Sequence, residues 1–199
     1  MKKLNSRGFK LCRAILGPIF KWYYKPTIIN KEVLPKEGPI LIVGNHKHLF
    51  DQCLAIISTK RVIHYMAKKE YWDSKKTAWF FDLAGCIPVN RQTKDNDAKN
   101  AAVEVLKNGG AIGLFPEGTR NGLEKNNGQM KNGATYLALK TGVPILPVGI
   151  KGKMKPFSKV TLNFGKPIDY SKYLNEKITK QLEEKTTEEL KEKIIELTQ

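Results

Sequence analysis

The sequence has little cysteine. Cys12, Cys53 and Cys86 are the three cysteines among 199 residues. Their number is odd, they lie far apart, and they lack the close Cys or His spacing that zinc sites use. We therefore expect neither a disulfide framework nor a structural metal, and this usage favours a reducing cytosol.

A long apolar run is also absent. The apolar stretch at residues 11–24 is interrupted by Arg13, Pro18 and Lys21, and it is shorter than the roughly 20 residues that a membrane-spanning helix needs. No small-residue cleavage site accompanies it. We therefore expect no spanning helix and no secretion signal.

The N-terminal segment lacks acidic residues up to Glu32, so its basic residues are unopposed; they are Lys2, Lys3, Arg7, Lys10, Arg13, Lys21 and Lys25. Apolar side chains are interleaved with them, and three aromatic residues precede Lys25, which is typical of a helix lying in a membrane interface. Pro18 is expected to kink or split this helix. The alternative is an amphipathic helix that only packs on the domain.

The formal net charge of +16 favours a polyanionic partner, which is nucleic acid, an anionic membrane face or a phosphorylated substrate. With 199 residues, 41% of them hydrophobic, the chain can bury a full core and form one domain with short extensions. We assign residues 1–30 to a basic amphipathic membrane-interface segment and residues 31–199 to the domain.

From Pro39 onward, short apolar runs alternate with helical stretches. The runs predicted as strands are 39–43, 61–66, 86–89, 111–115, 144–150 and 159–164. Helices are predicted from Asp95 or Asp97 to the glycines at 109–110, and over residues 134–140. The order predicts an α/β fold, a single domain with a mainly parallel or mixed central sheet flanked by helices, after the N-terminal amphipathic segment. In the tail, one structural helical stripe is predicted from Leu174, Ile178, Leu182, Leu190 and Ile194.

A histidine and an aspartate follow the first of these strands in an HxxxxD pattern, His46 and Asp51. If Asp51 begins the next helix, the short loop can fold His46 back onto it, and the carboxylate then fixes the imidazole tautomer. No GxSxG motif supplies a nucleophile, and Cys53 lies in an apparent helix rather than on an exposed turn. A base without an enzyme nucleophile suggests activation of a substrate hydroxyl. Alone, this spacing is weak evidence for catalysis, because HxxxxD often arises by chance and a lone His near an Asp is more often structural.

Two further strand ends carry arginines. Asn90 and Arg91 follow one strand, and the segment Pro116–Arg120, with the sequence PEGTR, follows another. The planar arginine fork matches phosphate oxygens, and Gly118 permits a tight turn. Each loop alone is also compatible with a surface ion pair or an ordinary turn, but together with His46 they predict a phosphate-binding cleft.

These blocks together resemble those of the glycerolipid acyltransferase family, which includes the 1-acylglycerol-3-phosphate acyltransferases. The resemblance covers residues 39–150 in the order NHxxxxD, GxxxxxR, FPEGTR and a VPILPV strand. It implies that His46 is the general base and Asp51 its orienting partner. The other residues that it implies at the substrate site are Asn45, Lys68, Asn90, Arg91, Glu117, Gly118, Thr119, Arg120 and Pro147. Among them, Arg91, Glu117, Gly118 and Arg120 would bind the acceptor phosphate, Lys68 would add positive charge, and Pro147 would shape the acyl side.

Two positions depart from the family pattern. His48 stands where Ser is frequent, and Asn90 stands where many members have Asp. Neither is the base or its partner, but both bear on which acceptor fits. The alternative for His48 is that it has no role in the reaction. His64 lies inside an apparent strand and is expected to be structural.

The resemblance implies transfer of a fatty acyl group from a thioester, acyl-CoA or acyl carrier protein, to the free hydroxyl of 1-acylglycerol 3-phosphate, which gives phosphatidic acid. No metal and no bound cofactor are expected. The partners would be the lysophospholipid, the acyl donor and an anionic membrane surface, with the protein in the cytoplasm, peripheral on the inner face of the cell membrane.

Three alternatives remain open at this point. Another acceptor, such as glycerol 3-phosphate, a different lysophospholipid or an aminolipid, would use the same residues. An inactive lipid-binding relative would also carry them. A basic nucleic-acid-binding domain would explain the net charge but not the HxxxxD and FPEGTR blocks, and it predicts salt-sensitive binding that survives replacement of His46.

Overall fold

A computed structural model describes residues 6–90, 92, 95–120 and 128–199 of the chain. Its sheet has seven strands in the order β1-β7-β6-β2-β5-β3-β4, and all neighbours are parallel except β6 and β7, which are antiparallel. The strands are β1 (Thr27–Ile29), β2 (Ile40–Gly44), β3 (Ile63–Lys68), β4 (Ile87–Val89), β5 (Ala111–Leu114), β6 (Ile145–Gly152) and β7 (Val160–Phe164). The predicted α/β fold with a mixed sheet is confirmed.

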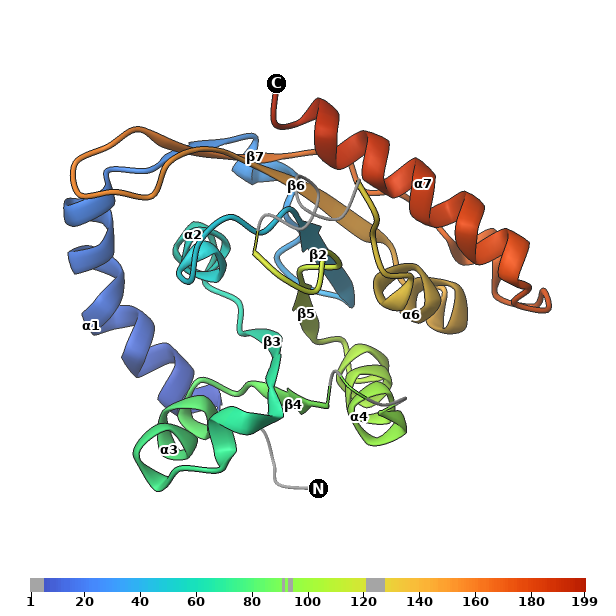
Figure 1. Cartoon of the computed structure of the whole chain (residues 1–199), viewed down its shortest axis with the longest axis horizontal. Coiled ribbons are helices and arrows are strands. Elements are labelled where there is room, and N and C mark those ends of the chain that lie inside the picture. The colour runs from blue at the N-terminus through green and yellow to red at the C-terminus, as the bar shows by residue number, and fades with distance from the viewer. Residues whose placement is uncertain (1–5, 91, 93–94, 121–127) are drawn as a thin grey trace.

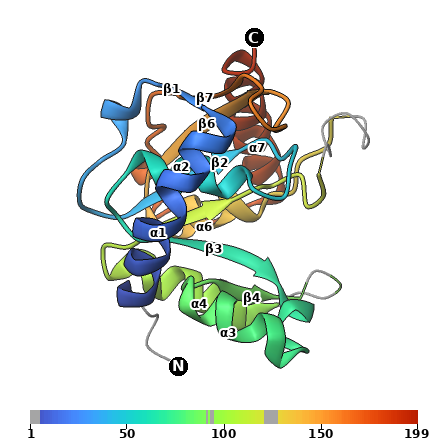
Figure 2. The same cartoon turned by 90° about the vertical axis from the view of Figure 1, so that its left-hand side faces the viewer.

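Helices cover both faces of this sheet (Figures 1 and 2). One side carries α1 (Ser6–Tyr24) and α2 (Asp51–Ser58), with α3 (Lys75–Leu83) beside the start of α1. The other side carries α4 (Asn96–Lys107), α6 (Gly133–Thr141) and α7 (Lys180–Glu196). Short 3-10 turns occur at Lys31–Val33, Lys69–Trp72 and Ser171–Tyr173.

Strand β2 shows why two helical layers are needed. Successive side chains of a strand point to opposite faces, and all five residues of β2 are buried. Leu41 and Val43 belong to the core under α4, α6 and α7, whereas Ile40 and Ile42 belong to the core that also contains Leu54 of α2. The central strand is therefore apolar on both sides.

All six predicted strands are present, with ends that shift by one or two residues. The sequence analysis missed β1, which has only three residues and pairs in parallel with β7 at the edge of the sheet. The segment between Pro26 and Asn30 is too short to give a periodic signal. This segment is extended because its backbone pairs with the free edge of β7.

The predicted helices after β4 and before β6 are also confirmed. Asp95 caps α4, with its side chain accepting a hydrogen bond from the backbone N–H of Ala98. Gly142 ends α6 in the left-handed region at φ 68°.

The predicted tail stripe is wrong at its beginning. The α7 helix starts only after Thr179, whose side chain accepts a hydrogen bond from the N–H of Leu182. Leu174 precedes the helix and is 50% exposed, while Leu190 and Ile194 are fully buried. The cap at Thr179 therefore separates the first two residues of the stripe from the helical face that packs on the core.

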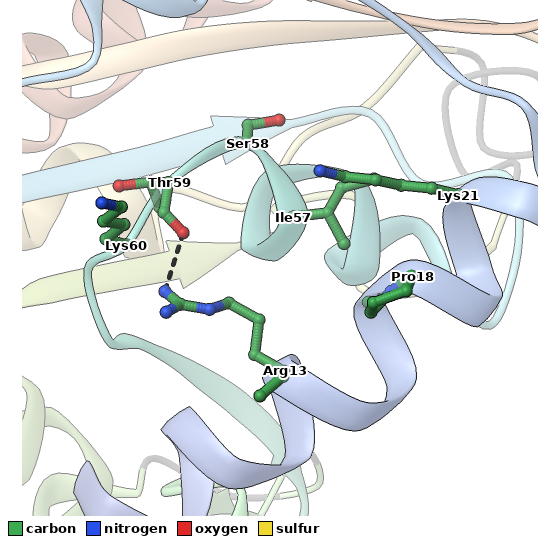
Figure 3. Close-up of a pocket in the computed structure, with 9 residues that line it drawn as sticks. Arg13, Pro18, Lys21, Ile57, Ser58, Thr59 and Lys60 are labelled. Atoms are coloured by element: carbon green, nitrogen blue, oxygen red, sulfur yellow. Dashed lines mark hydrogen bonds between the residues drawn. The ribbon is translucent and has the colours of Figure 1, made fainter.

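The α1 helix is continuous through Pro18, so the predicted split does not occur. Its inner side meets α2, and the Arg13 guanidinium donates a hydrogen bond of 2.9 Å to the carbonyl of Thr59, just past the end of α2 (Figure 3). Its outer side exposes large apolar residues, which are Leu11, Ile15, Leu16, Ile19, Trp22 and Tyr23. Among the described helices, none is long and apolar enough to cross a membrane.

Candidate active site

The candidate site lies at the edge of the sheet where the parallel strands β2, β5, β3 and β4 end. Because these neighbouring strands run in one direction, their carboxyl ends meet at the same edge. His46 follows β2, and the Phe115–Arg120 loop follows β5. Lys68 ends β3, and Asn90 follows β4.

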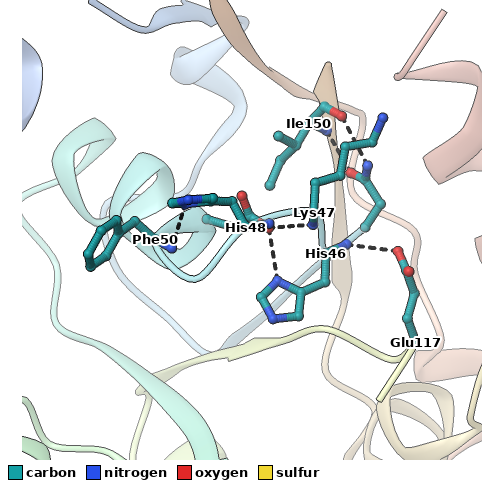
Figure 4. Close-up of polar contacts among 8 residues, drawn as sticks. His46, Lys47, His48, Phe50, Glu117 and Ile150 are labelled. Atoms are coloured by element: carbon teal, nitrogen blue, oxygen red, sulfur yellow. Dashed lines mark hydrogen bonds and ion pairs between the residues drawn. The ribbon is translucent and has the colours of Figure 1, made fainter. Parts of the chain in front are cut away.

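His46 and Asp51 form a hydrogen-bonded pair. His46 Nδ1 lies 2.8 Å from Asp51 Oδ2, and the two side chains are 18% and 1% exposed. Since a carboxylate accepts hydrogen bonds and does not donate them, Nδ1 carries the proton and Nε2 carries the lone pair. In Figure 4 the His46 ring points back from the turn after β2 towards the start of α2. The local geometry predicted from the HxxxxD spacing is therefore present.

Asp51 is the first residue of α2, as predicted, and its carboxylate organises the turn. Oδ2 also accepts hydrogen bonds from the backbone N–H groups of Lys47 at 2.6 Å and His48 at 2.7 Å. Oδ1 is buried and has no hydrogen-bond partner among the described residues. A carboxylate hydrogen-bonded to a histidine ring can orient the ring and stabilise an imidazolium formed during proton transfer. The turn can thus stabilise the imidazolium that forms when His46 takes up a proton.

The turn is also fixed from both neighbouring strands. The backbone N–H of His46 donates to Glu117 Oε1 at 2.8 Å, which joins the β2 turn to the loop after β5 (Figure 4). On the other side, Asn45 Nδ2 donates to the Ile150 carbonyl at 3.0 Å and Asn45 Oδ1 accepts from the Ile150 N–H at 2.7 Å. Both Asn45 and Glu117 are 3% exposed. The backbone of His46 and Asn45 is therefore held between the loop after β5 and strand β6.

Gly44 allows this close approach. A Cβ built on Gly44 would lie 2.8 Å from the carbonyl oxygen of Val148 on β6. Any larger residue would push the end of β2 away from β6 and disturb the hydrogen bonds of Asn45.

An aromatic stack supports the His46 ring. The ring centroids of His46 and Phe115 are 4.4 Å apart at an interplanar angle of 10°, and Phe115 stacks in turn on Tyr65 at 5.7 Å and 20°. Burial raises the pKa of the Tyr65 phenol, and the nearby Cys53 and Asp51 raise it further. Tyr65 is therefore neutral at physiological pH and acts as part of an apolar floor.

The FPEGTR loop turns tightly at Gly118, which has φ +70°. A Cβ there would lie 2.9 Å from the Cε atom of Lys131, so the Lys131 side chain lies directly over this glycine. The Lys131 N–H donates to the Pro116 carbonyl at 2.9 Å and closes the loop. Thr119 and Arg120 are exposed. The loop therefore buries its carboxylate against His46 and presents its arginine to solvent.

The remaining predicted residues occupy different positions around this centre. The Asn90 N–H donates to Asp95 Oδ2 at 2.7 Å, which ties the strand end to the cap of α4. Lys68 forms an exposed ion pair of 2.9 Å with Glu70. Pro147 lies in β6 beside Val43 and is buried. Arg91 lies outside the described residues.

The other histidines and the cysteines have surroundings that differ from the His46 turn. His64 Nδ1 is hydrogen-bonded to the Gly85 carbonyl at 2.7 Å inside the sheet, which fits the predicted structural role. The His48 ring contacts Tyr24 and Phe50. Burial and the charge of Asp51 raise the pKa of the Cys53 thiol to about 12, so it is protonated at neutral pH. In the described part of the chain, no three His, Cys, Asp or Glu side chains cluster in a way that would hold a metal.

Sequence reasoning did not identify Phe115, Tyr65 and Lys131 as parts of the site. The sequence did contain a signal for Phe115, because this residue ends the predicted strand 111–115, directly before the PEGTR residues. Tyr65 lies in the middle of β3, where an aromatic residue is expected to be part of the hydrophobic core. Lys131 is thirteen positions after Gly118, and only the closed loop brings them together.

Comparisons with known proteins identify the family and the fold. The sequence profile of the family described as Acyltransferase matches residues 25–151, which is more than half of the chain. A 1-acyl-sn-glycerol-3-phosphate acyltransferase of Bacillus subtilis is 28% identical over 80% of this chain and 82% of its own length. The chloroplastic enzyme LPAT1 of Arabidopsis thaliana, with the same name, is 31% identical over 75% of this chain, which spans 45% of that relative.

A solved structure supports the fold assignment. The crystal structure of the 1-acyl-sn-glycerophosphate acyltransferase PlsC from Thermotoga maritima aligns with a TM-score of 0.66 and 26% identity, over 95% of this chain and 79% of that one. The resemblance inferred from the sequence blocks is therefore confirmed: the chain belongs to the acyltransferase family.

Proposed function

We propose that the chain transfers a fatty acyl group from a thioester to the free hydroxyl of 1-acylglycerol 3-phosphate and so makes phosphatidic acid. The observation that carries this proposal is the His46–Asp51 pair, which is tied through Glu117 to the loop that presents Arg120. This places a base beside a loop that suits an anionic acceptor. The relatives named above, which are 1-acyl-sn-glycerol-3-phosphate acyltransferases, support the choice of acceptor.

His46 acts as the general base in this proposal. Nε2 takes the proton from the acceptor hydroxyl while the hydroxyl oxygen attacks the thioester carbonyl carbon. The tetrahedral intermediate then collapses, the carbon–sulfur bond breaks, and the thiol leaves with the proton that His46 held. An ester and a free thiol are formed, and no metal or bound cofactor takes part.

Asp51 keeps the base ready for both steps. Its bond to Nδ1 holds the tautomer in which Nε2 is basic, and its buried charge stabilises the imidazolium. The N–H groups of Lys47 and His48 fix the carboxylate in place, so it does not rotate when the charge on His46 changes. Asp51 therefore contributes by pre-organisation rather than by proton transfer.

The acceptor phosphate is bound on the side of the FPEGTR loop. Arg120 is exposed there and its planar fork suits a phosphate, and Lys131 over Gly118 adds a second cation. Arg91 and Lys68 complete the set that the family resemblance implies. Glu117 has a different part in this arrangement: its carboxylate is turned towards the His46 backbone, so it positions the base and closes the loop.

The acyl donor is acyl-CoA or acyl carrier protein, since either carries the thioester that this chemistry uses. Pro147 borders the acyl side from β6. Donor choice does not change the roles of His46 and Asp51, because both donors present the same functional group.

The α1 helix is proposed to hold the enzyme on the inner face of the cell membrane. In this division of the chain, residues 1–30 form the membrane-interface segment and residues 31–199 form the acyltransferase domain. The exposed apolar residues of α1 include Trp22 at 66% and Ile19 at 58% exposure, next to the basic residues of the same helix. Exposed Trp79 and Phe80 on α3, near the start of α1, extend this apolar surface. A membrane-bound acceptor would then meet the site without leaving the bilayer.

The test is mass-spectrometric detection of phosphatidic acid from purified protein, either acyl donor and 1-acylglycerol 3-phosphate in detergent. His46→Ala should lower the rate about 100-fold to 10,000-fold, because the general base is lost. His64→Ala is the matched control, since His64 lies inside the sheet; once its folding is verified, it should keep most of the activity. Folded wild-type protein that acylates glycerol 3-phosphate or another lysophospholipid instead would replace the proposed acceptor, and activity that survives His46→Ala would refute the mechanism.

A further inference from the structure

A pocket away from the His46 turn lies between α1 and the end of α2 (Figure 3). Its volume is about 470 Å³, which is in the range of small-molecule sites. Gly17 and Pro18 of α1 form one wall, and Ile57 with the Ser58–Lys60 segment forms the other. The two walls lie close together at Gly17, where an added Cβ would lie 3.8 Å from Ile57 Cγ2, an ordinary van der Waals distance.

The pocket is positively charged. Arg13, Lys21 and Lys60 line it, and none of the described residues around it carries a carboxylate. In Figure 3 the Lys21 side chain extends across Ile57 towards the end of α2, and Lys60 stands beside Thr59. The hydrogen bond from Arg13 to the Thr59 carbonyl fixes the guanidinium at the wall and uses one of its five N–H groups.

The end of α2 opposes anion binding, but only weakly. A helix C-terminus has the effect of about half a negative charge, and one of its nearby carbonyls, that of Thr59, is already bound by Arg13. Three unit positive charges outweigh this dipole. The pocket therefore favours an anionic group over a neutral or cationic one.

The position of the pocket indicates where that group comes from. Ala14, Gly17 and Lys21 lie on one side of α1, and the exposed Ile15 and Trp22 lie on the adjacent outer side of the same helix. A phosphate in the pocket can therefore be continuous with acyl chains that lie along the apolar surface of α1. We propose that this pocket binds the phosphate group of an anionic phospholipid, at a site separate from the catalytic turn.

This proposal goes beyond the acyl-transfer reaction and does not depend on it, but it rests on the membrane contact proposed above for α1. The test uses the full chain in neutral detergent, titrated with phosphatidylglycerol or phosphatidylcholine, and native mass spectrometry to measure the bound fraction. Lys21→Gln with Lys60→Gln should weaken phosphatidylglycerol binding on the order of tenfold or more. The matched control is Lys107→Gln with Lys140→Gln, which removes the same charge from α4 and α6 on the other face of the sheet and should change binding less than about twofold.

A second variant separates a defined site from general surface charge. Gly17→Leu fills the pocket without changing the charge, so it should weaken phosphatidylglycerol binding like the lysine pair; if it fails to fold, the lysine comparison decides. Equal loss in both lysine pairs, no loss in Lys21→Gln with Lys60→Gln, or equal binding of the two lipids would overturn the proposal. Displacement of phosphatidylglycerol by inorganic phosphate at similar concentration would assign the pocket to a soluble phosphate compound and overturn the lipid assignment.

Discussion

The two sides of the candidate site differ in how they are held. On the side of the base, His46, Asp51 and Asn45 are joined to one another or to neighbouring strands by hydrogen bonds of 2.6–3.0 Å. On the side of the proposed acceptor site, Arg120 and Thr119 are exposed, and Lys68 forms an exposed ion pair with Glu70, two positions away. One side is preorganised, and the other presents charged side chains to solvent.

In the proposed mechanism, this difference corresponds to two tasks. Proton transfer depends on short distances, so the base gains from a turn that cannot move. Capture of a phosphate depends on charge, which acts over longer distances and tolerates mobile side chains. Substitutions on the base side should therefore lower kcat, and substitutions on the acceptor side should mainly raise KM.

Asp51→Asn should have the largest effect. The amide cannot hold the imidazole in the required tautomer or stabilise its charge, so we expect kcat to fall on the order of 1,000-fold with little change in the KM for the acceptor. Steady-state kinetics with purified protein measure both constants. Asp97→Asn in the first turn of α4 is the control, because it removes an exposed carboxylate from another helix N-terminus. A change confined to KM would contradict the division of tasks.

Arg120→Gln should have an intermediate effect on the other constant. Loss of a charge-assisted contact with phosphate should raise the KM for the acceptor roughly 10-fold to 100-fold, while kcat changes by less than about threefold. Titration of the acceptor at saturating donor gives this separation, and Lys166→Gln is the control from an exposed loop away from the FPEGTR segment. A fall in kcat as large as the rise in KM would instead show that Arg120 acts in the chemical step, together with His46 and Asp51.

Thiol alkylation should have the smallest effect. With a pKa raised to about 12 by burial, the Cys53 thiol stays protonated at pH 7, so iodoacetamide should react with it slowly and leave activity unchanged. Its reactivity should increase as the pH rises towards 12, provided that the fold persists. Mass spectrometry of the labelled peptides, followed with activity over time, measures both. Rapid inactivation that tracks Cys53 labelling would point to an enzyme nucleophile and contradict the proposed direct attack of the acceptor hydroxyl on the thioester.

The sequence predicts the parts of the molecule whose signals are local. The HxxxxD spacing predicts the His46–Asp51 contact because five residues and a helix start are enough to make it. The alternation of strands and helices predicts the order of the elements for the same reason. The Thr179 cap also lies within a few residues of the helix that it starts, but the period-four pattern of apolar residues in the tail conceals it.

Other features depend on contacts between distant segments. The β1 strand exists because β7 offers an edge, and Asn45 is fixed by Ile150, 105 residues away. The aromatic stack also joins separate segments, since His46 follows β2, Phe115 follows β5 and Tyr65 lies within β3. Periodicity and spacing carry no information on such contacts, so the family resemblance located the blocks but not the hydrogen bonds that join them.

The bond between Asn45 and Ile150 has a consequence for the order of folding. The HxxxxD turn is encoded early in the chain, but one of its fixed points lies on β6, which is made much later. A chain emerging from the ribosome can form the local contact between His46 and Asp51 well before it can hold the turn in place. Long-range pairing of this kind slows folding, because the chain loses the entropy of a large loop before the new contact stabilises it. Catalytic competence should therefore appear late in folding, together with the docking of β6 against β2.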